Sequence, residues 1–110
     1  MTIQASPPLT PETTTDMAAR AAEAAAYLKT LAHEGRLMIL CHLGTGEKSV
    51  TELENLLEIR QAAVSQMLAR LRDEGLVSTR RDGKTIYYSL LDRNTEQVIG
   101  LLYRLFCEAR

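Results

Sequence analysis

Two cysteines carry the most reactive side chains in this chain of 110 residues. Cys41 and Cys107 stand far apart in sequence, so they cannot form the dense disulfide framework of a small secreted protein. The polar start of the chain shows no secretory signal pattern, and no apolar run approaches the roughly 20 residues that span a bilayer. The sequence therefore predicts a cytoplasmic protein without a membrane segment, whose thiols are reduced at rest.

The two thiols allow three interpretations. With His33 and His42, the two cysteines could bind a soft metal ion such as Zn²⁺ or Cu(I). His42 follows Cys41 directly, however, and adjacent side chains on a helix point about 100° apart. The two thiols could instead form a conditional link with each other, or each could fill apolar space as an inert side chain. We expect both histidines to be surface or boundary residues and keep metal sensing as an alternative.

The spacing of these residues does not indicate an enzyme. A thiol oxidoreductase needs a Cys-x-x-Cys pair or a cysteine beside an orienting base, and the sequence contains neither. A Gly-rich phosphate loop and a serine triad are also missing. The sequence predicts no enzyme activity and no cofactor.

The net charge of −1 conceals an uneven distribution. Residues 1–59 carry 4 basic and 8 acidic side chains, whereas residues 60–84 carry 6 basic and 3 acidic ones. A local basic excess is the usual electrostatic mark of contact with a polyanion such as DNA. Residues 60–84 therefore form the candidate nucleic-acid contact.

Composition and periodicity predict the elements that position these groups. Residues 1–14 are rich in proline and threonine and are expected to form a flexible arm, followed by one domain over residues 15–110. Two apolar helices are predicted first in that domain, over about residues 15–32 and 36–43. Cys41 lies on the second of them.

A helix–turn–helix and a hairpin are predicted next. Ser49 and Glu52 match a capping box at the start of a short helix that reaches about Leu57. A helix over residues 61–74 follows, with one apolar face. Asp82-Gly83 then joins two strands, residues 76–81 and 84–90, in a β-hairpin with a basic tip.

A broadly apolar helix over residues 92–110 completes the chain and carries Cys107. So much apolar surface on a terminal helix favours a subunit interface, which would also compensate for the thin core of a 12.3-kDa chain. The predicted fold class is mainly α with a β-hairpin wing, a winged helix–turn–helix of five helices and one hairpin.

This order of elements suits DNA binding. The major groove admits one helix, and the second helix of the pair would read it while the hairpin contacts the backbone or the minor groove. Glutamine, arginine, serine and lysine side chains can bond base edges or phosphates. Each alone could equally be a solvated polar residue. The candidate DNA contacts are Arg60, Gln61, Ser65, Gln66, Arg70, Arg80, Arg81 and Lys84.

Residues 49–90 resemble the winged helix–turn–helix core of the ArsR-type bacterial repressors. The most specific stretches are VSQMLARLRDEGLV and RRDGKTIYYSL, and LAHEGRLMILCHL resembles the helix that precedes this core. The resemblance covers about residues 17–108. It implies a homodimer, held by the first and last helices, that binds a two-fold operator in double-stranded DNA and releases it when an inducer arrives.

Many members of that family sense metal ions, but this sequence departs from both recurrent metal sites. Ser49 and Thr51 occupy the positions of a Cys-x-Cys pair, and Asp92 is followed by Asn94 with no histidine on the terminal helix. The placement of the two cysteines instead resembles the sulfide-responsive subgroup. That resemblance implies a redox switch in which persulfide or polysulfide links Cys41 to Cys107 through a di- or polysulfide bridge. A repressor with inert cysteines is the other alternative.

Two expectations concern the thiols themselves. We expect the reduced cysteines to lie beyond the Cα separation of about 4.4–6.8 Å that suits a simple disulfide, so that peroxide is a poor inducer. One thiol should also have solvent access or a basic neighbour, because the thiolate is the nucleophile. Arg104 and Arg110 are candidate neighbours of Cys107, although both could be solvated charges.

Overall fold

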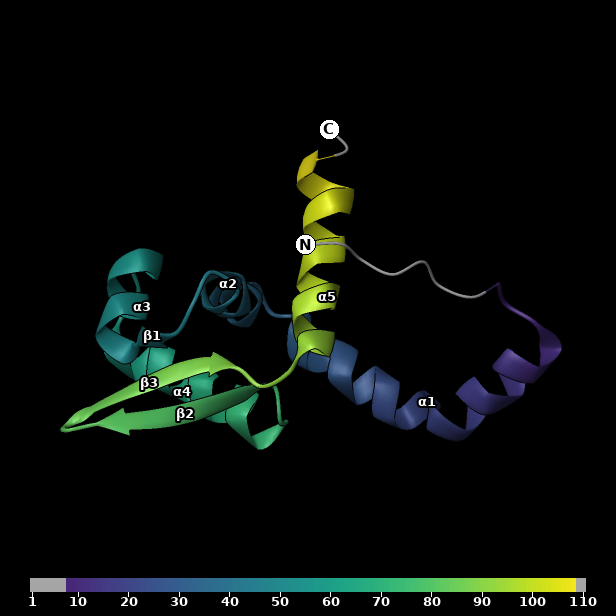
Figure 1. The fold of residues 1–110 in the computed structure, drawn as a ribbon, viewed down its shortest axis with the longest axis horizontal. Helices are drawn as coiled ribbons and strands as arrows, with labels where there is room; N and C mark the ends of the chain where they lie inside the picture. The colour runs from purple at the N-terminus through teal and green to yellow at the C-terminus, as the bar shows by residue number, and fades with distance from the viewer. Residues whose placement is uncertain (1–7, 109–110) are drawn as a thin grey trace.

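The computed structural model describes residues 8–108, and this part of the chain holds five α-helices, a three-stranded sheet and a π-helical turn (Figure 1). The predicted winged helix–turn–helix class is confirmed. The elements follow in the order α1 (Pro11–Leu31), α2 (Glu34–Leu43), β1 (Lys48–Ser49), α3 (Val50–Leu57), α4 (Gln61–Asp73), β2 (Val77–Asp82), β3 (Thr85–Leu90), α5 (Arg93–Tyr103) and the π turn (Arg104–Glu108).

Helix α1 begins at Pro11, earlier than the predicted start near residue 15. Thr10 caps it, because its hydroxyl accepts the Thr13 amide and the Thr13 hydroxyl accepts the Thr10 amide at 2.8 Å. Pro11 fits the first helical position, where no backbone donor is needed. The predicted flexible arm over residues 1–14 is therefore wrong for residues 11–14, and residues 1–7 lie outside the described part of the chain.

The helix–turn–helix is built as predicted. Ser49 and Glu52 form the capping box of α3, with the Glu52 carboxylate accepting the Ser49 amide at 2.9 Å. Glu58 ends α3 in the left-handed conformation, at φ 55°, and so turns the chain toward α4. Arg60 occupies the N-cap of α4 without a side-chain capping bond, as expected for a residue type that is a poor cap.

The hairpin of β2 and β3, called the wing from here on, differs from the prediction at its tip. Asp82 pairs with Thr85, so the two-residue turn is Gly83-Lys84 and not Asp82-Gly83. Gly83 has φ 65° whereas Lys84 does not have a positive φ, a combination typical of a type II′ turn. The sheet also has a short third strand, β1, which pairs with β3 and was not predicted.

The hydrophobic core joins α2 to the α3–α4 pair and to the wing. Helix α1 contributes only its last turn, where Thr30 and Leu31 are buried, and the rest of α1 extends away from the other elements (Figure 1). None of the described helices is long and apolar enough to cross a membrane. The buried apolar residues are Leu31, Ile39, Leu40, Leu43, Leu53, Val64, Leu68, Leu71, Leu76 and Val77.

The last helix is shorter than the predicted span of residues 92–110. Asp92 caps α5 by accepting the amides of Asn94 and Thr95, and the α-helix ends at Tyr103. The π turn follows and carries Cys107. Residues 109 and 110 lie outside the described part of the chain.

Candidate DNA-binding surface and thiol cleft

Helix α4 is anchored by one face and exposes the other. Val64 and Leu68 are fully buried in the core, which fixes the rotation of the helix about its axis. Gln61, Ser65 and Gln66 are exposed in its first turns. Three of the predicted DNA contacts are therefore free to reach a groove.

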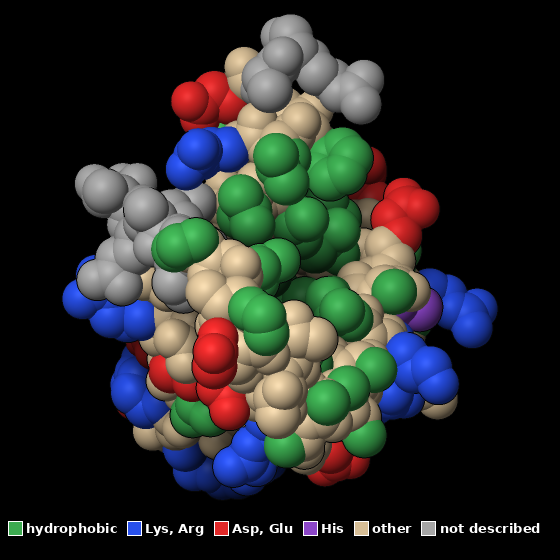
Figure 2. Space-filling view, turned by 90° about the vertical axis from the view of Figure 1, so that its right-hand side faces the viewer, with side chains coloured by type: hydrophobic (Ala, Val, Ile, Leu, Met, Phe, Trp, Pro, Cys, Tyr) green, Lys and Arg blue, Asp and Glu red, His purple; other side chains and the backbone are tan. Residues whose placement is uncertain are grey.

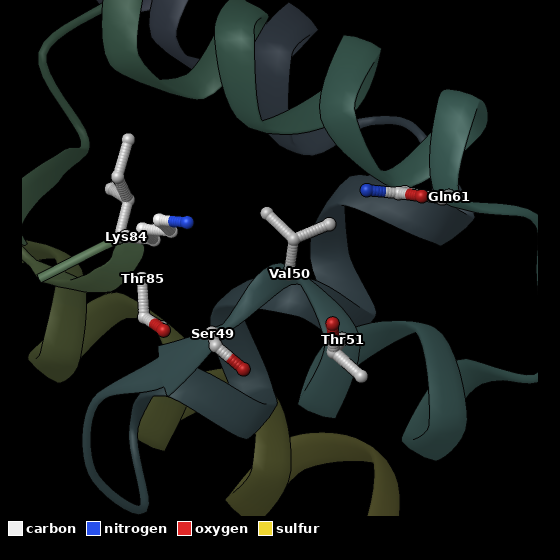
Figure 3. Close-up of a pocket in the computed structure, with 7 residues that line it drawn as sticks. Ser49, Val50, Thr51, Gln61, Lys84 and Thr85 are labelled. Carbon is white, nitrogen blue, oxygen red and sulfur yellow. The ribbon is translucent and has the colours of Figure 1, made fainter.

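A polar cleft of about 250 Å³ lies between the start of α4, the start of α3 and the wing (Figure 3). Gln61 and Lys84, two predicted DNA contacts, line it from opposite elements. Figure 3 shows Thr51 and Thr85 at the same cleft, and neither was among the DNA contacts predicted from the sequence. A threonine just inside the α3 capping box stands where helix amides are unpaired, and that signal could have found Thr51.

The other predicted contacts are dispersed. Arg60 lines a separate hollow at the α3–α4 turn, together with Glu54 and Glu58. Arg70 lies near the end of α4 and forms an ion pair with Glu74, with 3.4 Å between Nε and Oε1. Arg81 is exposed in the wing opposite Ile86. These three residues do not share a cleft with Gln61 and Lys84.

Arg80 is exposed, but its side chain is paired with Glu47, an acidic residue that the sequence did not single out. Its Nε donates to Glu47 Oε2 at 3.2 Å and its Nη2 donates to Glu47 Oε1 at 2.5 Å. The guanidinium also lies 4.8 Å from the centre of the Tyr87 ring. The hydrogen bond from Arg80 holds the pKa of Glu47 below its ordinary value. No local sequence signal joins Glu47, in the loop before β1, to a residue of the wing.

A second cleft, of about 420 Å³, opens beside Cys41. We call it the thiol cleft. It lies between α2, the loop that follows α2, the end of β3, and the α5–π segment. The residues lining it are Cys41, Gly44, Thr45, Leu90, Glu96, Ile99, Gly100, Tyr103, Arg104 and Glu108.

The two thiols differ in environment but interact electrostatically. Cys41 is half-buried and Cys107 is exposed, and both are free thiols. Burial raises the pKa of the Cys41 thiol above its ordinary value, and the charge of the Cys107 thiolate raises it further. Cys107 therefore lies close enough for its charge to reach Cys41, although the two are distant in sequence.

Cys107 lies in the π turn and is exposed. A regular α-helix would place residue 107 on the same face as Tyr103, since residues four apart lie above one another. In the structure, Tyr103, Arg104 and Glu108 line the thiol cleft, and Cys107 is not part of the lining. π-helical turns are rare and often occur at functional sites.

The remaining candidates near the thiols have other surroundings. Arg104 lines the thiol cleft, whereas Arg110 lies outside the described residues. His33 is exposed and caps α2 by accepting the Arg36 amide at its Nδ1. Within residues 8–108, no group of three His, Cys, Asp or Glu side chains could hold a metal ion.

A broad apolar face covers α1 and α5. Figure 2 shows hydrophobic side chains gathered on this side of the molecule. Leu28 is 62% exposed and Phe106 is 59% exposed, which is unusual for large apolar side chains. A groove between the two helices is lined by Met17, Tyr27 and Val98, among others, and Tyr27 donates to the Thr95 hydroxyl beneath it.

Comparisons with known proteins agree with this architecture. A sequence profile for "Bacterial regulatory protein, arsR family" matches residues 33–79. The biofilm growth-associated repressor of Agrobacterium fabrum is 50% identical over 91 residues, which cover 83% of this chain and 78% of that protein. The transcriptional activator HlyU of Vibrio cholerae is 46% identical over 86% of this chain and 87% of its own length.

Solved structures show the same similarity. The transcriptional repressor BigR from Xylella fastidiosa is 46% identical and superposes with a TM-score of 0.81, covering 90% of this chain and 98% of that one. Reduced HlyU from Vibrio cholerae superposes with a TM-score of 0.78 at 46% identity, covering 84% and 97% of the two chains. The chain therefore belongs to the ArsR family of bacterial regulatory proteins, as a DNA-binding transcriptional regulator and not an enzyme.

Proposed function

We propose that this protein is a homodimeric repressor that releases its operator when a persulfide or polysulfide links Cys41 to Cys107. The observation that supports the role of the thiols is the thiol cleft. There Cys41 faces the α5–π segment across the cleft, and the charge of Cys107 raises the pKa of its thiol. The relatives named above are transcriptional regulators, and their names do not specify an inducer.

DNA contact is assigned to α4 and the wing. Gln61, Ser65 and Gln66 would meet base edges or phosphates in the major groove, because they are exposed on the first turns of α4. Lys84, which shares the polar cleft with Gln61, and Arg81 would contact the flanking backbone. Arg60 and Arg70 would add phosphate contacts at the two ends of α4.

The apolar face of α1 and α5 supports a homodimer. Helix α1 has 21 residues but buries only its last turn, and most of the stability of a helix in a protein comes from packing of its apolar face. Pairing with a second copy would cover the exposed side chains of both helices. Two reading helices are then held at a fixed separation, which a two-fold operator requires.

The switch itself is a balanced sulfur exchange. The exposed Cys107, as thiolate, attacks an internal sulfur of an inorganic polysulfide, and the S–S bond breaks to release a shorter polysulfide anion. The protein then carries Cys107–S–S–SH. Cys41, as thiolate, attacks the sulfur next to the terminal SH, and hydrosulfide leaves. The two cysteines are oxidised and sulfane sulfur is reduced to sulfide, so no other oxidant is needed.

Such a bridge would tie α2, which supports the reading helix, to the helix of the subunit interface. A small rotation of the two DNA-binding regions of the dimer would move their reading helices out of alignment with half-sites about 34 Å apart. A coupling free energy of about 1–3 kcal/mol corresponds to a 5–150-fold loss of operator affinity. A longer sulfur chain also removes the distance limit of a simple disulfide.

Fluorescence anisotropy with an operator duplex tests this proposal. We expect polysulfide to weaken binding by the wild type about 5–150-fold and to leave Cys41→Ser and Cys107→Ser unchanged. Mass spectrometry of proteolytic peptides should show Cys41 joined to Cys107 with one or more extra sulfur atoms. Release of the wild type by Zn²⁺ that is lost in both serine variants would favour the metal alternative, and a wild type that does not respond to polysulfide or Zn²⁺ would indicate inert cysteines.

A further inference from the structure

The side chains of Glu47, Arg80 and Tyr87 form a clasp across the whole sheet. Arg80 lies on β2, Tyr87 lies opposite it on β3, and Ser49 of β1 lies on the other side of Tyr87. Glu47 precedes β1 by one residue and accepts two hydrogen bonds from the Arg80 guanidinium. Strand β1 pairs over only two residues, so the clasp adds a side-chain tie where the backbone ladder is shortest.

The geometry of this clasp is unusually specific for a surface ion pair. Most exposed pairs are weakly ordered, but a bidentate arginine–carboxylate pair fixes both partners in one plane. Stacking of the guanidinium on Tyr87 fixes that plane against the sheet. Arg80 is thus committed to Glu47 and Tyr87, although it stands in the basic segment that the sequence assigned to DNA.

The loop that carries Glu47 is also a wall of the thiol cleft. Gly44 and Thr45 line that cleft next to Cys41. The loop is held by its own hydrogen bonds, since the Thr45 hydroxyl donates to the His42 carbonyl at 2.7 Å and Lys48 Nζ donates to the Thr45 hydroxyl at 3.0 Å. These bonds tie Thr45 to both His42 and Lys48. A displacement of Thr45 would therefore also move Glu47, which lies between Thr45 and Lys48.

We propose that Glu47 and Arg80 are positioning residues for DNA binding, which set the angle of the wing so that Arg81 and Lys84 meet DNA while Arg80 does not. We further infer that the loop from Gly44 to Glu47 carries a change in the thiol cleft to the wing. The second statement rests on the proposed thiol switch, whereas the first requires only that the protein binds DNA.

Two roles for Arg80 predict opposite signs for one substitution. If Arg80 contacts phosphate and Glu47 merely competes for it, removing the Glu47 charge frees a cation and raises DNA affinity. If the clasp positions the wing, Glu47→Gln lowers operator affinity, even though it removes a negative charge from a protein that binds a polyanion. We expect a loss of roughly 2- to 30-fold.

Operator titrations at several salt concentrations provide the test. Arg80→Gln and Arg80→Lys should both weaken binding as Glu47→Gln does, because lysine cannot replace a bidentate guanidinium. The slope of the logarithm of the binding constant against the logarithm of the salt concentration should stay the same in these variants. Loss of one phosphate contact would instead reduce its magnitude by about 0.9. Asp82→Asn is the matched control: it removes a wing carboxylate outside the clasp and should raise affinity. Tighter binding by Glu47→Gln, or a shallower slope for Arg80→Gln, would overturn the positioning role.

The coupling to the thiols is tested with the same variants after polysulfide treatment. The wild type should lose operator affinity in full, and Glu47→Gln should lose less, because its wing is already released from the loop. A full response in Glu47→Gln would refute the coupling. A wild type that does not respond would refute the thiol switch instead, and the sign test on reduced protein would still decide the positioning role.

Discussion

The reading unit, made of α3, α4 and the wing, completes its packing within one chain, whereas the face of α1 and α5 does not. In the reading unit, Leu53, Val64 and Leu68 have no exposed surface. On the other face, Leu28, Tyr103 and Phe106 are each more than half exposed. Both regions contain enough apolar residues for a core, but only the first has elements on all sides of them.

The difference follows from how each region is connected. Short turns fold α3, α4 and the wing back on one another, so their apolar faces meet locally. Helix α1 is joined to the rest only through its C-terminal end, and nothing in residues 8–108 covers its outer side (Figure 1). The reading unit therefore buries its own apolar residues, whereas the α1–α5 face leaves its apolar residues exposed within residues 8–108.

The largest expected effect on operator binding comes from placing a charge on the apolar face of α1 and α5. Leu28→Glu should convert the proposed homodimer to monomer at micromolar concentration, since a buried unpaired carboxylate opposes association. Operator affinity should fall about 100-fold or more, because the second half-site loses its tethered reading helix. Sedimentation equilibrium and operator titration measure the two effects.

Leu56→Glu is the matched control for Leu28→Glu. Leu56 is also about half exposed, but it lies on α3, in the reading unit. Its variant should remain dimeric. If both variants stay dimeric, the interface of two copies does not lie on the α1–α5 face.

Smaller effects on operator binding should distinguish two exposed residues of α4, Gln66 and Arg70. Gln66→Ala should cost about 1–3 kcal/mol in operator binding and relax specificity at one base position, because this side chain is exposed on the part of α4 that we propose to enter the major groove. Arg70→Ala, which already has Glu74 as a partner, should weaken binding evenly across sequences and reduce the salt dependence. Equal losses on operator and random DNA for Gln66→Ala would contradict a base contact.

The smallest change concerns only the rate at which the thiols are labelled. The folded protein raises the pKa of Cys41, so alkylation of Cys41 should reach half its maximal rate at a higher pH than in the urea-unfolded chain. Because the folded state binds this proton more tightly, the free energy of unfolding falls as the pH rises past the pKa of the unfolded cysteine.

Cys107→Ser sharpens that measurement. It removes the neighbouring charge and should lower the pKa of Cys41, while burial still keeps it above the unfolded value. Iodoacetamide labelling followed by peptide mass spectrometry gives both profiles. Identical Cys41 profiles with and without Cys107 would mean that the two thiols do not interact.

Much of the fold was predictable because its signals are local. The Ser49–Glu52 capping box, the apolar stripe of α4 and the glycine at the wing tip each act within a few residues. Errors arose where a local signal was misread, as at Thr10 and Pro11, which cap α1 earlier than expected. The strand β1 carried no readable signal, because two residues cannot show an alternating pattern.

The candidate site divides in the same way. Exposure of Gln61, Ser65 and Gln66 followed from the periodicity of α4, and the basic segment was visible as a charge excess. The pairing of Arg80 with Glu47 was not predicted, because composition counts a charge but does not reveal its partner. Only the sheet register brings Glu47 within hydrogen-bond distance of it.

The sequence by itself determined the winged helix–turn–helix, its reading helix and the separation of two reactive thiols into different elements, since propensity, capping and periodicity act between near neighbours. The tertiary structure alone decided that Cys107 stands within electrostatic reach of Cys41, that a cleft opens between their elements, and that Arg80 is held by Glu47. Those relations join residues far apart in the chain, and the packing of α5 and the pairing of β1 with β3 create them.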